Sequence, residues 1–364
     1  MSQPDKKLIA FHQLNDFSGS PKVLSMTINA LLEDGYEIDL VTTEGGCLDL
    51  IKSPNLKVHY FPYKFTSNKA ATLFRSTLSQ FHMFFYGLRH GKGKKFLINT
   101  IMPIGGALAG KILGSEIFYH YHENAFYKGF YYKMKAKVML ALADRIFCVS
   151  KYQKGFLPQR PNIDVIPNAL FKSQKDKLTA HTLKGFESKE ILLVSSLRAY
   201  KGVTLFARLA QRMPDYKFVL VANATNEEIC NYWKSQKVTV PPNLSVFTRQ
   251  KDVTPFYNSA GLLVNLSDKR YFVETFGLTV LEAMAAGVPV IVPDEGGIVE
   301  LVDNGRNGYV VDVRNIDIIE ETARKVFSDY DRYVAMSENA IATAAGFSEK
   351  KYNETITKAI NHKK

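Results

Sequence analysis

Two glutamates eight residues apart are the first residues in this sequence whose spacing suggests chemistry. Glu274 precedes a helix predicted over residues 277–287, and Glu282 lies within that helix. A helix N-terminus leaves its first amides without intrahelical partners and carries about half a positive charge, so it favours an anion such as a diphosphate. An amphipathic helix packed on an α/β sheet, with solvated acids, would explain the same residues without any ligand.

The wider segment favours the first interpretation. Residues 274–289, ETFGLTVLEAMAAGVP, resemble the E-x7-E signature of family 4 retaining glycosyltransferases, which have the GT-B fold. The resemblance implies that Glu274 binds hydroxyls of the donor sugar and that Glu282 binds the ribose of a nucleoside diphosphate sugar. It also implies donor contacts at the start of the helix, which comprises Phe276, Gly277, Leu278 and Thr279.

A second segment, LVSSLRAYKG, ends at Gly202 and resembles the strand, loop and helix in which the family places an Arg and a Lys against the phosphates. The resemblance assigns Lys201 to this pair. It assigns Arg198 less directly, because the usual Arg position, five residues before the Lys, holds Ser196. Two cations beside a diphosphate would neutralise the leaving group as the glycosidic bond breaks.

Two residues of the first half fit the same resemblance. His122 ends a predicted strand over residues 117–122 and resembles the family's His at the donor-sugar pocket; strand ends of open α/β sheets are where ligands bind. Gly19 lies in the loop between the first strand and helix, where the family's glycine loop touches donor phosphate and acceptor. A structural histidine and a simple connecting turn are the alternatives.

No metal or cofactor is expected. His120 and His122 could suggest a metal pair, but no third ligand lies at a useful spacing. Asp329-Tyr-Asp331 is a DxD sequence, yet it falls in a predicted helical stretch with no strand before it, which favours chance composition. The nucleoside diphosphate sugar is therefore expected as a substrate, with its charge met by the cations and the helix N-terminus.

These residues need elements to position them, and the sequence alternates strands and helices in two series. It predicts strands over 7–12, 37–42, 96–100, 117–122 and 145–150 with a short last strand at 165–167, and again over 190–195, 217–222, 244–247, 262–266, 289–293 and 308–311. Such alternation is typical of parallel sheets covered by helices, so we expect an α/β, GT-B protein with two Rossmann-like domains. The expected parts are an acceptor domain (1–170), a linker (171–189), a nucleotide-sugar domain (190–346) and a C-terminal helix (347–364) that packs back on the first domain.

The formal net charge of +12 is concentrated in one region, because residues 51–180 carry 21 Lys and Arg against 5 Asp and Glu. Such a region attracts nucleic acid, anionic lipid or a phosphorylated substrate. The segment 67–90 adds four phenylalanines to its basic residues, which suits either a helix resting on an anionic membrane or a core-facing helix with a basic rim. Three cysteines and no long apolar run favour a cytoplasmic protein.

We therefore expect a retaining, metal-independent glycosyltransferase. It would move a hexose-type sugar from a nucleoside diphosphate sugar to a glycan or lipid-linked acceptor in bacterial surface polysaccharide synthesis, at the inner face of the membrane. The alternatives are a nucleotide-sugar epimerase of the same fold and a non-enzymatic protein that binds polyanions or lipid. The sequence leaves the base, the donor sugar, the acceptor, the linkage and the oligomeric state open.

Overall fold

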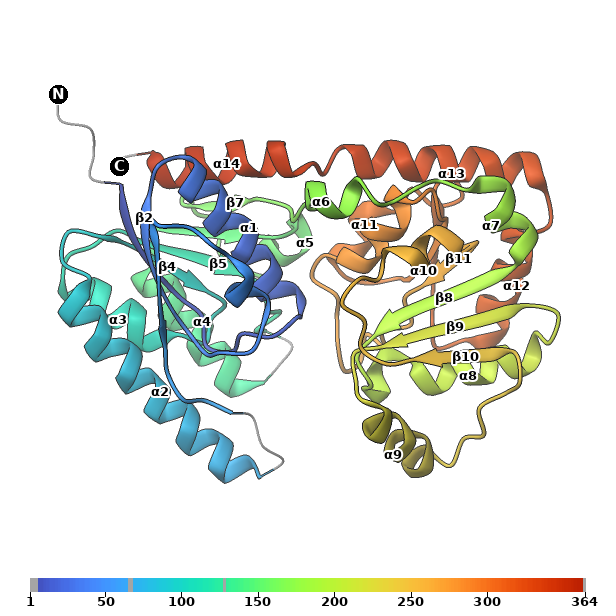
Figure 1. Ribbon diagram of the computed structural model, residues 1–364, viewed down its shortest axis with the longest axis horizontal. Coiled ribbons are helices and arrows are strands. Elements are labelled where there is room, and N and C mark those ends of the chain that lie inside the picture. The colour runs from blue at the N-terminus through green and yellow to red at the C-terminus, as the bar shows by residue number, and fades with distance from the viewer. Residues whose placement is uncertain (1–5, 65–67, 127–128, 363–364) are drawn as a thin grey trace. The chain divides into compact units, whose positions relative to one another are not determined.

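The computed structural model describes residues 6–64, 68–126 and 129–362. It divides into two compact units, one comprising Met1–Asn168 with Glu349–Lys364 and the other Ala169–Ser348. Each unit contains a parallel sheet covered by helices (Figure 1), which confirms the predicted fold class. None of the described helices is long and apolar enough to cross a membrane.

The first unit has a seven-stranded sheet in the order β3-β2-β1-β4-β5-β6-β7. Its strands are β1 (Lys7–Phe11), β2 (Glu37–Thr42), β3 (Leu56–Tyr60), β4 (Lys95–Asn99), β5 (Ile117–Tyr121), β6 (Arg145–Cys148) and β7 (Ile163–Val165). Its helices are α1 (Gly19–Glu33), α2 (Lys69–His90), α3 (Ile104–Ile112), α4 (Phe130–Leu142), α5 (Lys151–Lys154) and α14 (Glu349–Asn361), with a 3-10 turn η1 (Cys47–Leu50).

Helices cover both faces of this sheet. The crossover through α1 runs one way along the sheet, whereas the crossovers through α2, α3 and α4 run the other way, so right-handed connections place α1 on one face and the other three on the opposite face. The C-terminal α14 packs on α1, where the hydroxyls of Tyr352 and Thr27 lie 2.6 Å apart. On the other face, Gly105 lets α3 approach α2 closely, because a Cβ there would lie 2.0 Å from the Gln80 carbonyl oxygen.

The second unit has a six-stranded sheet in the order β10-β9-β8-β11-β12-β13. Its strands are β8 (Glu190–Ser195), β9 (Lys217–Ala222), β10 (Leu244–Phe247), β11 (Leu262–Val264), β12 (Val290–Pro293) and β13 (Gly308–Val311). Its helices are α6 (Lys172–Lys175), α7 (Thr182–Ser188), α8 (Val203–Arg212), α9 (Asn226–Gln236), α10 (Thr254–Ser259), α11 (Leu278–Ala285), α12 (Ile316–Val326) and α13 (Tyr330–Ala345), with 3-10 turns η2 (Ala199–Lys201) and η3 (Gly297–Leu301).

The segment 171–189, predicted as a linker, lies in the second unit and contains α6 and α7. Phe186 of α7 packs its ring against Tyr330 and Tyr333 at centroid distances of 5.2 and 5.3 Å. This segment therefore contributes apolar side chains to the core of the second unit.

Each sheet reverses its strand order once, and these points decide where ligands can bind. In the first sheet the reversal lies between β1 and β4, and in the second between β8 and β11. All strand pairs in both sheets are parallel, so neighbouring strands end at the same edge. Open α/β sheets bind ligands beyond the carboxyl ends of the strands at such reversals, because the loops on either side diverge there.

Candidate active site

A lysine and a glutamate meet at the reversal point of the second sheet. Lys201 lies in the turn that follows β8, and Glu274 lies in the loop that follows β11. The Lys201 Nζ forms an ion pair with the Glu274 Oε1, and the Ser267 hydroxyl donates to the same oxygen over 3.3 Å. The side chains of Lys201 and Glu274 retain only 16% and 18% of their exposure. The structure thus brings together two residues that the sequence assigned separately to the donor site.

Aromatic packing fixes the lysine in this position. The Lys201 Nζ lies 3.7 Å from the centroid of the Phe272 ring, and Tyr200 stacks on the same ring at 5.3 Å. The two loops are also joined through the backbone, since the Asp268 amide donates to the Tyr200 carbonyl over 2.7 Å. At Gly202, φ is +76° and a Cβ would lie 2.4 Å from Leu266, so glycine is required for this close approach.

The ion pair keeps Glu274 charged. Burial by itself would raise the pKa of this carboxyl group, but the charge of Lys201 and hydrogen bonds from Lys201, Asn265 and Ser267 outweigh it, so the pKa lies below its ordinary value of 4.5. At neutral pH the site therefore presents a carboxylate that can accept hydrogen bonds from hydroxyl groups. Two of the three Lys201 N–H groups are directed at Glu274 and Ser267, which leaves a third donor for an anion.

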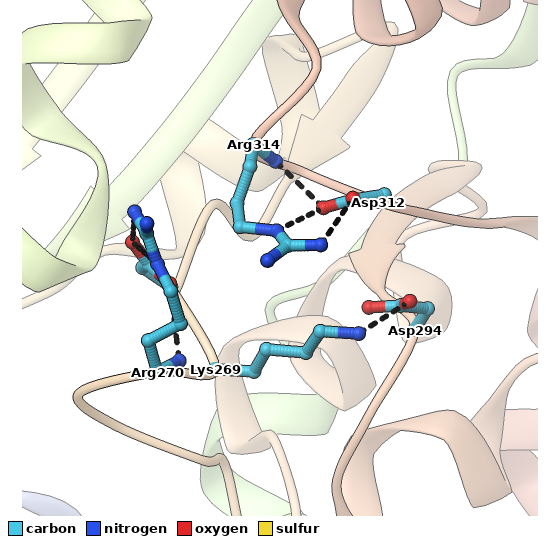
Figure 2. A network of polar contacts seen from close by, with 6 residues as sticks. Lys269, Arg270, Asp294, Asp312 and Arg314 are labelled. Carbon is cyan, nitrogen blue, oxygen red and sulfur yellow. Dashed lines mark hydrogen bonds and ion pairs between the residues drawn. The ribbon is translucent and has the colours of Figure 1, made fainter.

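The loop that carries Glu274 is tethered to the strands beside it. Lys269 and Asp294 form an ion pair of 2.7 Å, which Figure 2 shows beside the pair formed by Arg314 and Asp312. The Gly297 amide donates to the carbonyl oxygen of Glu274 over 2.8 Å. Glu274 is therefore held through its backbone as well as its side chain, which preorganises it for binding.

Three residues after Glu274, Gly277 is the N-cap of α11, whose start has no side-chain cap. Gly277 has a φ of +98°, and a Cβ there would lie 2.6 Å from Ile298 Cγ1, so only glycine fits. The predicted phosphate amides, those of Gly277, Leu278 and Thr279, form the first turn of this eight-residue helix. These amides and the helix dipole make the turn attractive to an anion.

Glu282, one turn further along α11, is buried with 5% of its surface exposed. The hydroxyl of Tyr257 donates to its Oε2 over 2.5 Å. Burial, followed by the charge of Glu282 and this hydrogen bond, raises the pKa of Tyr257 well above its ordinary value, so the phenol stays a donor. The structure thus holds this carboxyl group in place from α10, rather than leaving it in solvent.

Two predicted donor residues are placed differently. The Phe276 side chain is buried and packs edge-on against Phe347 at 5.7 Å, which leaves its backbone for a donor contact. The Arg198 side chain is exposed. Hydrogen bonds from Thr225 lower the pKa of Glu228 in α9 against the opposing effect of burial, and the charges of Arg249 and then Arg198 add to this lowering. Arg198 therefore does not share the buried setting of Lys201.

In the first unit, an asparagine links two histidines at the corresponding reversal point. Asn99, the last residue of β4, donates through Nδ2 to the Ser20 carbonyl over 3.2 Å and to His12 Nδ1 over 3.0 Å. Because the Ser20 carbonyl can only accept, the amide orientation is fixed and the Asn99 Oδ1 faces His122 Nε2 at 2.9 Å. His122 thus carries its proton on Nε2, and Gly19 lies one residue from the contact with Ser20.

Both histidines of this chain of hydrogen bonds are neutral at physiological pH. Burial lowers the pKa of His12 to about 4 and, with the like charges of His120 and His12, lowers that of His122 well below 6.5. His120 is also buried, its ring 4.3 Å from that of His122, and neither of its nitrogens has a hydrogen-bond partner among the residues that the structure describes. Within the described ranges, no three His, Cys, Asp or Glu residues are grouped as a metal site.

Sequence reasoning missed several of these supporting residues. His12 and Asn99 each stand at the end of a buried strand, and Ser267 follows β11 closely, so polar residues after apolar strands were the available signal. Tyr257 gave no such signal. The DxD sequence has a structural explanation, because the Asp329 carboxylate accepts from the Arg332 amide over 2.7 Å and caps α13.

Comparisons with known proteins agree with this geometry. Residues 174–343 match the family model described as glycosyl transferases group 1. The chain is 31% identical over 160 residues to the N-acetyl-alpha-D-glucosaminyl L-malate synthase of Bacillus anthracis, covering 42% of this chain and 40% of that one. It is 25% identical over 223 residues to the lipopolysaccharide core biosynthesis mannosyltransferase LpsB of Rhizobium meliloti, covering 57% and 62%. The chain thus aligns with less than two thirds of either curated relative.

A solved structure extends the likeness to the whole fold. Anabaena HepE, crystallised with UDP and glucose, superposes with a TM-score of 0.77 at 18% identity, covering 98% of this chain and 99% of that one. Its fold is therefore the fold of both units here. The chain therefore has the GT-B fold, and residues 174–343 of its second unit resemble the group 1 glycosyltransferases.

Proposed function

We propose that this protein is a retaining, metal-independent glycosyltransferase that takes a hexose-type sugar from a nucleoside diphosphate sugar. The observation that carries the proposal is the ion pair of Lys201 and Glu274 beside the uncapped start of α11. A cation, a carboxylate and a set of helix amides meet at one strand reversal, where such a donor would bind. The cation and the amides suit its pyrophosphate and the negative charge that develops as this group departs, and the carboxylate suits its sugar hydroxyls.

Each group has a distinct task in this proposal. The first-turn amides of α11 and the third N–H of Lys201 bind the pyrophosphate and stabilise the charge that develops as the glycosidic bond breaks. The carboxylate of Glu274 accepts hydrogen bonds from sugar hydroxyls, and Glu282 binds the ribose. The acceptor hydroxyl attacks from the face that the leaving group departs from, which retains the anomeric configuration. For His122, which is neutral and oriented by Asn99, we keep the donor-sugar role that the family resemblance implies.

Known proteins similar to this chain support the donor class. HepE was crystallised with UDP and glucose, and LpsB is named as a mannosyltransferase of lipopolysaccharide core synthesis. We propose for this chain a glycan or lipid-linked acceptor of bacterial surface polysaccharide synthesis, met at the cytoplasmic side of the membrane. The concentration of positive charge in residues 51–180 suits an anionic or membrane-borne acceptor.

The test is a transfer assay with the Glu274→Ala variant. Because the Glu274 side chain keeps only 18% of its exposure, urea unfolding is used to check that the variant is folded, and the folded variant should lose transfer by orders of magnitude. Full transfer by the folded variant would reject the assigned role. Incubating the donor without acceptor distinguishes a transferase from an epimerase. An isomerised sugar would indicate an epimerase, whereas we expect the donor to stay intact or to be hydrolysed slowly.

A further inference from the structure

Three helices on one face of the first sheet contain no acidic residue. α2, α3 and α4 together hold seven Lys and Arg and no Asp or Glu. They pack side by side, α2 on α3 and α3 on α4, and their order follows β4, β5 and β6 across the sheet (Figure 1). This face, which we call the α2–α4 face, is therefore uniformly positive.

Large apolar side chains are exposed on the same helices. On α2 they form one stripe, since Phe74, Leu78, Phe81 and Phe85 are spaced by three or four residues and each is more than half exposed. The neighbouring helices also expose large apolar side chains, Ile112 of α3 (66% exposed) and Phe130 of α4 (79% exposed). Packing on the sheet does not account for them, because the core-facing side of α2 consists of other residues, such as the buried Met83 and Ser76.

Exposed cations lie on the same three helices. Arg75 and Arg89 are exposed on α2, as are Lys111 on α3 and Lys133 and Lys137 on α4. An exposed apolar patch on this scale marks an interaction surface. Phenylalanines between arginines and lysines suit the boundary of a lipid bilayer, where rings enter the acyl region and cations meet phosphate headgroups.

We propose that the α2–α4 face docks on an anionic membrane surface. Charge decides between this occupant and a second copy of the chain, because two such faces would bring like charges together without a single acid to pair them. This proposal depends on the proposed function in one respect only, namely that docking would bring a lipid-linked acceptor to the enzyme. Binding to lipid can be measured without any sugar transfer.

The test is co-sedimentation with vesicles of phosphatidylcholine containing phosphatidylglycerol, compared with phosphatidylcholine alone. One variant combines Arg75→Glu, Arg89→Glu and Lys111→Glu, and the matched control reverses three exposed lysines of the second unit, Lys175, Lys184 and Lys234, with the same change in net charge. The wild type and the control should bind the anionic vesicles, and the first variant should bind at least about a hundredfold more weakly.

A second variant tests the apolar stripe. Phe74→Ser, Phe81→Ser and Phe85→Ser together should also weaken binding by about tenfold or more, and the fold should survive because all three rings are exposed. Equal loss in the control variant, or equal binding to neutral vesicles, would overturn the proposal. Nucleoside diphosphate should stabilise every variant as it does the wild type, so a failure of the donor site would be seen separately from a failure of docking.

Discussion

Replacing Lys201 by Met tests the ion pair at the centre of the site. The substitution keeps an apolar stem against Phe272 and removes the charge that Glu274 depends on. Breaking a fully buried ion pair costs about 3–5 kcal/mol, but these side chains keep about a sixth of their exposure, and Glu274 keeps its hydrogen bonds from Ser267 and Asn265. We therefore expect the free energy of unfolding to fall by about 2 kcal/mol.

The catalytic loss should be larger than the loss of stability. Removing one preorganised group that stabilises developing charge lowers kcat by about 100- to 1000-fold. Lys201→Arg keeps the charge and should retain more activity than Lys201→Met. The assay is sugar transfer at saturating donor, at a temperature where urea unfolding shows each variant to be folded.

The pH dependence of the free energy of unfolding tests the ion pair of Lys201 and Glu274 in a second way. The pKa of Glu274 is lowered in the folded protein, so its contribution to stability is complete above its ordinary value of 4.5 and is lost as the pH falls through the lowered value. Without Lys201 the burial of Glu274 is no longer offset, so the pKa of this carboxyl group should rise, and the loss of stability that it causes on acidification should shrink or change sign. A folded Lys201→Met variant with wild-type kcat and an unchanged profile of stability against pH would refute the reasoning.

Three further substitutions probe the groups around this pair. Gly277→Ala should lower both Tm and donor affinity, measured by thermal unfolding with and without nucleoside diphosphate, because its φ is +98° and a methyl group would meet Ile298. Tyr257→Phe leaves Glu282 without its donor and should cost about 1–3 kcal/mol in urea unfolding; an unchanged midpoint would contradict the contact. Asn99→Leu should lower kcat more than it lowers stability, and the nitrogen chemical shifts of His122 should show loss of the fixed Nε2–H tautomer.

The elements that sequence predicted best are those whose pattern follows from burial. The strands over 190–195 and 217–222 were predicted with their observed bounds, because central parallel strands are apolar on both faces. β3 was missed, since it is an edge strand whose residues are exposed or half-buried and include Lys57 and His59. The last strand of the first sheet, predicted around 165–167, lies at Ile163–Val165.

Only those features of the site that depend on one continuous segment could be predicted from the sequence. The helix start at Gly277 and the two glutamates could be placed from local sequence, as could Lys201 in its loop. The ion pair of Lys201 with Glu274 joins residues 73 positions apart, and the bond of Asn99 to His12 joins residues 87 apart. Such contacts depend on which strands are neighbours in the sheet, and the order of the strands cannot be predicted from any single segment.

The most direct test of the central claim is calorimetric titration of the protein with nucleoside diphosphates and their hexose sugars. We expect one donor to bind, to stabilise the fold by about 2.7 kcal/mol at a hundred times its Kd, and to bind more tightly than its own diphosphate. Glu274→Gln should remove that difference while leaving diphosphate binding intact. A wild-type protein that binds no nucleoside diphosphate and none of these sugars would contradict the account.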